Sequence, residues 1–432
     1  MEGLVKGLLN VAFGNDENER DNQDRDERSR SSWAQVVTGE QEDDGVNSDR
    51  RTGYNRQDER YGRNEESRPH MIPQKPSQNM QASPQGYQRN EDERRDNVNQ
   101  SSWKQKEDEG NNDGWETVQK KPTKRHQQVK MDSWNNYKKP LDEQHYSNEV
   151  EYGVDMEPSE EELSDLSKAC NKLWELDLNR LVPGKDYQID CGEGKKVYNK
   201  DDMAEGCLFS WLNDDVFNKP SYSRFCSLLD NYNPHQGVKE NVTPEEKQEQ
   251  TAFIEEISRT APIKYLHKYL SLKGIVSGNY EEFKRMLTRL WFDLYSRGGT
   301  SASSSAFEHV FVGEIKERGE KEVSGFHNWL QFYLEEAKGN VDYQGYIFPQ
   351  RRGEIPDSET QLLTIQFEWN GVLKSVSSSL IGVSPEFEVA IYTLCYFVGG
   401  EENHVEIGPY PVNIKCYRLG DSIGSAFPVA EC

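Results

Sequence analysis

Two histidines and a lysine in the second half of the chain have side chains suited to acid–base chemistry on a phosphodiester. They are His309, His327 and Lys374. One histidine can remove the proton of a ribose 2′-hydroxyl and the other can protonate the departing 5′-oxygen, while the lysine stabilises charge on the phosphorane. This set is sufficient to cleave RNA without a metal at the reacting phosphorus. Each residue taken alone is more often structural than catalytic, and spacing does not show that the three converge.

The local sequence predicts how each of the three is positioned. His309 falls in a predicted strand, Phe307–Ile315, and His327 falls at the start of a predicted helix with Ser324 as the N-cap. The positive end of that helix would lower the pKa of His327, which suits a general base and leaves His309 as the acid. The opposite assignment also fits, because two coupled groups titrate together. The turn Asn370-Gly371 predicts a hairpin that returns Lys374 to the same edge.

A metal site is the alternative for the same region. His309, Glu314 and His327 carry possible ligand atoms. Their spacing matches no recurrent zinc-binding pattern. The seven cysteines are odd in number and include no CxxC pair, so they suggest neither a zinc site nor a disulfide framework.

The rest of the chain predicts one folded α+β domain behind a long arm. Residues 1–158 are polar and almost free of aliphatic clusters, which predicts a disordered, low-complexity arm. Residues 159–432 predict one domain, with a helical N-terminal part and a strand-rich C-terminal part. The expected helices are Pro244–Ser258 and Tyr280–Tyr295, after an opening helix near Ser159, and the expected strands are Phe307–Ile315, Thr364–Trp369, Val389–Phe397 and Val412–Leu419.

Several short features of the arm suggest partners and location. A short amphipathic segment lies at the N-terminus, and tryptophans recur in similar polar settings between residues 31 and 134, where they could be docking motifs for protein partners. No segment approaches the roughly 20 apolar residues of a membrane span, and the first residues lack a signal peptide pattern. We expect a cytoplasmic protein, with the nucleus as the alternative because of one basic cluster, Lys120, Lys121, Lys124, Arg125 and Lys130.

The charge balance limits how the chain would bind RNA. The formal net charge is −24, and residues 1–150 hold 24 Lys and Arg against 30 Asp and Glu, so most of the acidity lies in the predicted domain. Non-specific nucleic-acid binding needs a basic surface, because affinity comes largely from counterion release. The domain should therefore bind bulk RNA weakly and depend on a local pocket, a divalent ion or the arm.

Five stretches resemble the EndoU family of uridylate-specific endoribonucleases: Ala306–Glu314, Ser324–Tyr333, Lys374–Ser379, Ile381–Glu388 and Ile423–Pro428. The resemblance implies that His309 and His327 are the acid–base pair, that Lys374 stabilises the phosphate and that Ser378 reads the uracil edge. It also implies cleavage of single-stranded RNA 3′ of uridines, 2′,3′-cyclic phosphate ends, and stimulation by Mn²⁺ or Ca²⁺. Glu308 and Glu314 are the candidates for ion binding or for orienting the histidine.

One departure from the family concerns base recognition. The last family motif usually carries a tyrosine, whereas this chain has Ser425-Ala426-Phe427-Pro428. Phe427 can stack on a base but cannot donate a phenolic hydrogen bond, so we expect Ser425 and Phe427 to bind substrate with looser selectivity. The alternative is an RNA-binding or scaffolding protein that uses the EndoU-like domain and the disordered arm but no longer cleaves. The intact His309, His327 and Lys374 favour an active enzyme. We also expect the protein to be a monomer.

Overall fold

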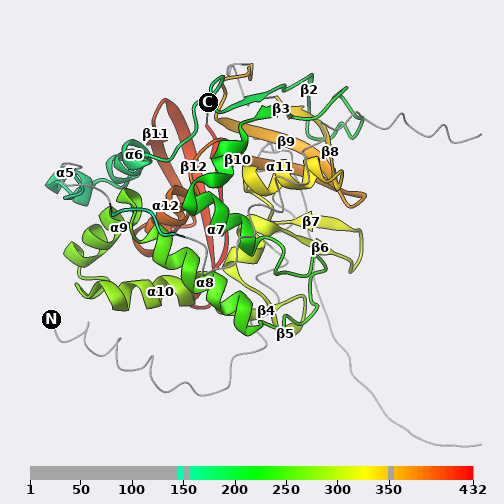
Figure 1. Ribbon diagram of the computed structural model, residues 1–432. Coiled ribbons are helices and arrows are strands. Elements are labelled where there is room, and N and C mark those ends of the chain that lie inside the picture. The colour runs from blue at the N-terminus through cyan, green and yellow to red at the C-terminus, as the bar shows by residue number, and fades with distance from the viewer. Residues whose placement is uncertain (1–144, 150–154, 349–354, 432) are drawn as a thin grey trace, which may run out of the picture. The chain divides into compact units, whose positions relative to one another are not determined.

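The computed structural model describes residues 145–149, 155–348 and 355–431 (Figure 1). Most of the arm predicted over residues 1–158 lies outside these ranges, together with the N-terminal amphipathic segment, the tryptophan motifs and the basic cluster. The described residues 145–149 contact the domain, so ordered contacts extend N-terminal to the expected boundary at Ser159.

Helices dominate the first part of the domain. Two begin with a capping box, in which Ser159 pairs with Glu162 and Thr243 pairs with Glu246, so exposed backbone N–H groups are satisfied at each start. The α-helices are α5 (Glu160–Ser164), α6 (Leu166–Leu176), α7 (Pro220–Leu228), α8 (Pro244–Ile257), α9 (Ala261–Leu272), α10 (Tyr280–Phe292), α11 (Trp329–Ala337) and α12 (Pro385–Val398), with a 3₁₀ turn η2 (Asp214–Asn218) and a π-helix η3 (Glu308–Val312).

Strands dominate the second part and form two larger sheets with three short pairs. The larger sheets have the orders β10-β9-β8-β2 and β11-β12-β13, and the pairs are β1-β3, β4-β5 and β6-β7. The bounds are β1 (Tyr187–Ile189), β2 (Gly194–Lys195), β3 (Phe209–Leu212), β4 (Tyr295–Arg297), β5 (Thr300–Ser304), β6 (Glu314–Lys316), β7 (Glu322–Ser324), β8 (Val341–Ile347), β9 (Leu362–Trp369), β10 (Val372–Leu380), β11 (Glu402–Ile407), β12 (Tyr410–Leu419) and β13 (Ser422–Ala430).

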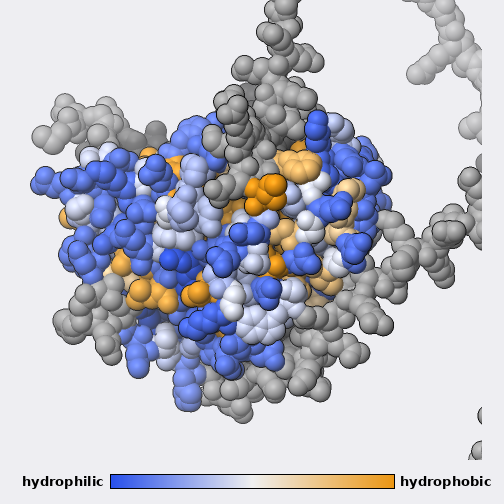
Figure 2. All heavy atoms as spheres, turned by 90° about the horizontal axis from the view of Figure 1, so that it is seen from above, coloured by the Kyte–Doolittle hydropathy of each residue, from blue (hydrophilic) through white to orange (hydrophobic). Residues whose placement is uncertain are grey.

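The two larger sheets meet where β10 packs beside β13. The η3 helix contacts β13, and β7 contacts β10, so η3, β7, β10 and β13 all lie at the junction of the two sheets. Helix α12 packs against α6, α7 and α9 and against β12 and β13, and thereby joins the helical part to the sheets (Figure 1). The face shown in Figure 2 is mostly hydrophilic, with hydrophobic residues in small groups.

The structure confirms the α+β class and several of the expected elements. Helices α8 and α10 and strands β9 and β12 lie where the sequence predicts them. The hairpin between β9 and β10 turns at Asn370 and Gly371, which both have positive φ, as a type I′ turn requires. Among the described residues, no helix has both the length and the apolar character that crossing a membrane requires.

Two predicted strands are wrong. Val389–Phe397 lies in α12, whose residues are buried on all sides through Tyr396, so no polar face reveals the helical period. Ser384 caps this helix and Pro385 occupies its first turn. Phe307–Ile315 begins as η3, which starts where the Glu308 N–H donates to Ser305 Oγ at 3.1 Å; only its end, from Glu314, is strand.

Candidate active site

The two histidine-bearing segments lie side by side and are joined through their backbones. The Phe326 N–H donates to the His309 carbonyl at 3.2 Å, and the His327 N–H donates to the Val310 carbonyl at 2.9 Å. Gly325 permits this approach: its φ is +65°, and a Cβ there would lie 1.7 Å from the His309 oxygen. The backbone thus brings together the segments of two histidines that lie 18 positions apart in the sequence.

His309 is held by a buried carboxylate. Its Nδ1 lies 2.6 Å from Glu314 Oε2, and the Glu314 side chain is fully buried. The Arg297 guanidinium lies 3.4 Å from the same oxygen and donates to the Gly424 carbonyl of β13 at 2.5 Å. Because a carboxylate only accepts hydrogen bonds, the Nδ1 of His309 carries the proton in this pair. Glu314 therefore orients the ring and stabilises its protonated form.

His327 is buried just before α11 and not inside it, which corrects the prediction. The N-cap of α11 is Asn328, whose Oδ1 accepts from the Gln331 N–H at 2.9 Å, whereas Ser324 belongs to β7. The pKa of His327 is nevertheless well below its usual range, first because of burial and then because of the positive charge of Lys374 and of His309. The neutral form expected from a helix dipole thus arises from desolvation.

Two serines of β10 hold the His327 segment. The Ser377 hydroxyl donates to the Phe326 carbonyl at 2.8 Å and lies 3.3 Å from His327 Nδ1. The Ser379 hydroxyl donates to the His327 carbonyl at 2.7 Å. Sequence reasoning missed both serines, and it also missed Arg297. Ser377 and Ser379 alternate along β10, the strand that also carries Lys374, and this alternation is the signal that could have found them. An irregularity in register between Lys374 and Ser377 obscures it.

Lys374 completes the group from β10, where the hairpin returns it toward β7. Its ammonium donates to the Val323 carbonyl at 3.1 Å, and the side chain is buried. Burial lowers the pKa of Lys374 to about 8, and Glu322 acts in the opposite direction. At neutral pH the lysine is mostly charged while His327 is neutral. The segments that carry the three predicted residues meet here: the His327 N–H donates to the carbonyl of Val310, the neighbour of His309, and the Ser377 hydroxyl on the strand of Lys374 lies 3.3 Å from His327 Nδ1.

The three predicted base-binding residues differ in where their side chains lie. The Phe427 ring stacks on the His327 imidazole, with centroids 4.6 Å apart and planes 19° apart. Ser425 is buried two residues earlier on β13 and so faces the same side of the strand. The Ser378 hydroxyl lies 2.8 Å from the Thr364 hydroxyl of β9.

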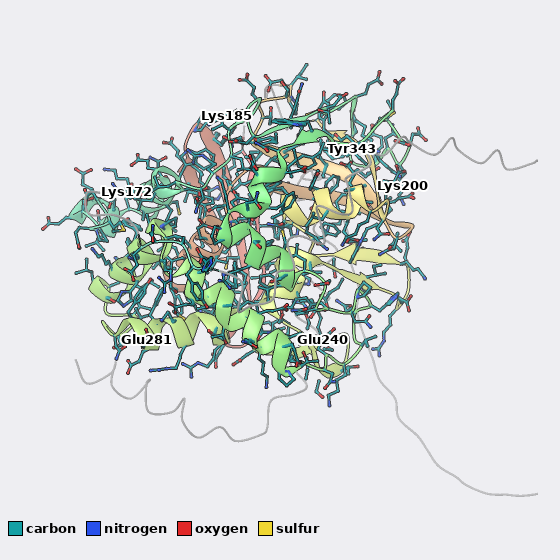
Figure 3. All side chains as sticks on the ribbon, in the orientation of Figure 1. Lys172, Lys185, Lys200, Glu240, Glu281 and Tyr343 are labelled. Atoms are coloured by element: carbon teal, nitrogen blue, oxygen red, sulfur yellow. The ribbon has the colours of Figure 1, made fainter. Side chains whose placement is uncertain are left out.

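Glu308 and Glu314, the candidate ion ligands, do not form a ready-made metal site. Glu314 is engaged by His309 and Arg297. Burial, reinforced by Glu314 and Glu240, raises the pKa of Glu308 well above its usual range. Glu240 (labelled in Figure 3) lies beside β5 through its backbone bond to Ala302. Within residues 145–149, 155–348 and 355–431, no group of three or more His, Cys, Asp or Glu is arranged to hold an ion.

Comparison with known proteins identifies the class to which this fold and site belong. Residues 165–428 match the family model described as Endoribonuclease XendoU. The chain is 41% identical over 272 residues to uridylate-specific endoribonuclease B of Danio rerio, covering 61% of this chain and 95% of that protein. It is 42% identical over 275 residues to poly(U)-specific endoribonuclease-B of Xenopus laevis, covering 61% and 93%.

A solved structure supports the same assignment. The structure titled "XendoU: a splicing independent snoRNA processing endoribonuclease" aligns with a TM-score of 0.55 at 41% identity, covering 62% of this chain and 96% of that chain. The chain belongs to the XendoU family of endoribonucleases, as the resemblance of its five motif stretches implies.

Proposed function

We propose that this chain cleaves single-stranded RNA 3′ of uridines by transesterification and leaves 2′,3′-cyclic phosphate ends. The observation that carries the proposal is the convergence of a neutral His327, a carboxylate-held His309 and a charged Lys374 in one buried group. The names of the relatives, uridylate-specific and poly(U)-specific endoribonucleases, support the choice of substrate.

In the proposed reaction the histidines have different roles because their surroundings differ. His327, kept neutral by burial, accepts the proton of the 2′-hydroxyl as the 2′-oxygen attacks phosphorus. His309, whose protonated form Glu314 stabilises, donates a proton to the 5′-oxygen as the P–O5′ bond breaks. The Lys374 ammonium stabilises the negative charge of the phosphorane between these two events. No metal at the reacting phosphorus is required for these steps.

Base recognition is proposed for the residues around His327. Phe427 would stack on the uracil ring directly, or it would hold the His327 ring flat against the uracil. Base–aromatic stacking contributes about 1–3 kcal/mol. Ser425 shares the face of Phe427, and Ser378 offers polar groups of β10. Because Phe427 lacks a hydroxyl, we propose that uridine is preferred less sharply than a tyrosine at this position would allow.

We also propose that Mn²⁺ or Ca²⁺ stimulates cleavage. The described residues offer no preformed cluster for the ion, and no step of the reaction is assigned to it. An acidic protein that carries a formal charge of −24 repels RNA, so a divalent ion could act by reducing this repulsion.

The proposal is tested with a short RNA that contains one uridine among adenosines. Wild-type protein, His309→Ala, His327→Ala and Lys374→Met are compared, and the cleavage position is mapped by gel or mass spectrometry. We expect one cut, 3′ of the uridine, with rates reduced at least about 100-fold in each variant. An RNA that is bound but never cut, with Mn²⁺, with Ca²⁺ and with chelator, would instead indicate a binding or scaffolding protein.

A further inference from the structure

A short segment that precedes the matched family region is seated on the helical part of the domain. Residues 145–149 (His145-Tyr146-Ser147-Asn148-Glu149) contact α7, α9 and the C-terminal end of α8. The receiving surface, which we call the cradle, consists of Arg224, Glu256, Arg259 and Lys264. The family match begins at residue 165, so the segment is an addition to the part of the chain that the family model describes.

Three residues of the segment, Tyr146, Ser147 and Glu149, each contact a complementary group of the cradle. The Tyr146 ring, which is 42% exposed, is contacted by two guanidiniums, with the Cζ of Arg224 at 4.2 Å and that of Arg259 at 4.9 Å from its centroid. The Ser147 N–H donates to Glu256 Oε2 at 3.1 Å, and the Ser147 hydroxyl donates to the other oxygen of the same carboxylate. Glu149 pairs with Lys264 at 2.8 Å.

The cradle contains a buried ion pair whose carboxylate accepts hydrogen bonds from the segment. Arg224 and Glu256 are 3% and 1% exposed, and their charged groups lie 3.7 Å apart. Such a pair is stable only when its remaining polar atoms are satisfied, because both charges have lost their water. The described residues offer no hydrogen-bond partner to Arg224 Nε or Nη1, and its guanidinium is instead covered by the Tyr146 ring. Both carboxylate oxygens of Glu256 are occupied by Ser147.

The helices of the cradle also form the wall behind His309. Phe225, next to Arg224 on α7, has its ring centroid 5.3 Å from that of Phe307 and 5.4 Å from that of Phe311. Phe253 of α8 lies 6.1 Å from Phe307. Phe307 and Phe311 flank the η3 residues Glu308, His309 and Val310, so a loosening of α7 against α8 would reach η3 through the contacts among these four aromatic rings.

We propose that residues 145–149 are a releasable intramolecular clamp, which reads as Tyr-Ser-x-Glu and holds α7 and α8 against η3. The clamp is released by negative charge at Ser147, because a second anion there would face the buried Glu256 carboxylate. The last stretch of the arm would in this way control the rigidity of the catalytic domain. The inference does not depend on cleavage of RNA, and its test measures none.

The test compares full-length Tyr146→Ala and Ser147→Asp with the wild type and with the control Asn148→Ala. Asn148 is exposed and makes no side-chain contact of the clamp. Melting temperature and amide hydrogen exchange are measured for all four proteins. We expect the two clamp variants to melt about 2–4 °C lower and to exchange roughly tenfold faster in α7, α8 and residues 307–312, while Asn148→Ala matches the wild type.

A second experiment, with an added peptide, distinguishes loss of the clamp from a general folding defect of the variant. A synthetic peptide of residues 143–151, added in excess to Tyr146→Ala, should restore the protection of α7 and α8, and the same peptide with alanine at 146 should not. Equal melting and exchange in Tyr146→Ala and Asn148→Ala would overturn the proposal. A Ser147→Asp protein that keeps wild-type protection would overturn the release by charge.

Discussion

Replacing Glu314 with Gln tests how the geometry around His309 supports catalysis. The Glu314 carboxylate is fully buried, accepts the Nδ1–H of His309 at 2.6 Å and is itself paired with Arg297. Glutamine keeps the shape but removes the charge, so the imidazolium formed by His309 loses its counter-charge. A hydrogen bond to a charged group contributes about 1.5–3 kcal/mol. At about 1.4 kcal/mol for each tenfold change, kcat should fall between roughly 10-fold and 150-fold.

The assay is single-turnover cleavage of the one-uridine RNA by wild-type and Glu314→Gln protein, each in chelator, in Mn²⁺ and in Ca²⁺. If Glu314 acts by orienting His309, the ratio of the two rate constants is the same in all three conditions. A defect that disappears at saturating ion would show that Glu314 holds the ion, and it would refute the orienting role. Arg297→Lys is the companion variant, because it keeps the positive charge but loses the guanidinium bond to Gly424.

The remaining predictions concern pH, specificity and the buried histidine. Because burial lowers the pKa of Lys374 to about 8, kcat/KM should fall as pH rises through about 8. Lys374→Arg should move this alkaline fall in kcat/KM to higher pH. If the variant still cleaves and the fall stays at the same pH, a group other than Lys374 causes it. The folded-state pKa of His327 lies below its unfolded value, so the unfolded chain binds the extra proton. The contribution of His327 to the free energy of unfolding is therefore fully present above about pH 6.5. Below that pH the free energy of unfolding decreases by up to about 1.4 kcal/mol for each pH unit. Urea unfolding at pH 7.5 and 5.5 should show a smaller loss for His327→Gln than for wild type, and equal losses would contradict the depressed pKa. Phe427→Tyr should sharpen the preference for uridine over cytidine in a competition assay, and no change in that ratio would remove Phe427 from base selection. Ser379→Ala, which removes the bond to the His327 carbonyl, should lower kcat by about 5- to 10-fold with little effect on KM; a change confined to KM would place Ser379 in substrate binding instead.

The sequence predicts those parts of the fold that depend on local signals. Pro244–Ile257 follows a threonine cap and a proline, and Asn370-Gly371 allows the positive φ of a tight hairpin, so α8 and the β9–β10 turn are predictable from their own residues. Helix α12 is not, because a helix buried on every side shows no polar period and its Val, Ile, Tyr and Phe favour strands.

The candidate site is predictable in its residue types but not in its geometry. His309, His327 and Lys374 are recognisable from their chemistry and from the family resemblance. Asn328 and Ser324 are both suitable helix caps, and only packing selects Asn328. Arg297 and Ser379 act through contacts with residues more than 50 positions away, Gly424 and His327, and no local pattern records such contacts. The docked Tyr146 lies in a stretch whose composition predicts disorder, yet it meets two arginines of the helical part.

The central claim is that the ribose 2′-hydroxyl is the nucleophile and that His327 takes its proton. The most direct test uses two RNAs that differ only at their single uridine, one with uridine and the other with 2′-deoxyuridine, and identifies the product ends by mass spectrometry. The account predicts a 2′,3′-cyclic phosphate from the first RNA, no cut in the second, and no cut in either by His327→Ala. Cleavage at the 2′-deoxyuridine, or a product that lacks the cyclic phosphate from the earliest time point, would contradict it.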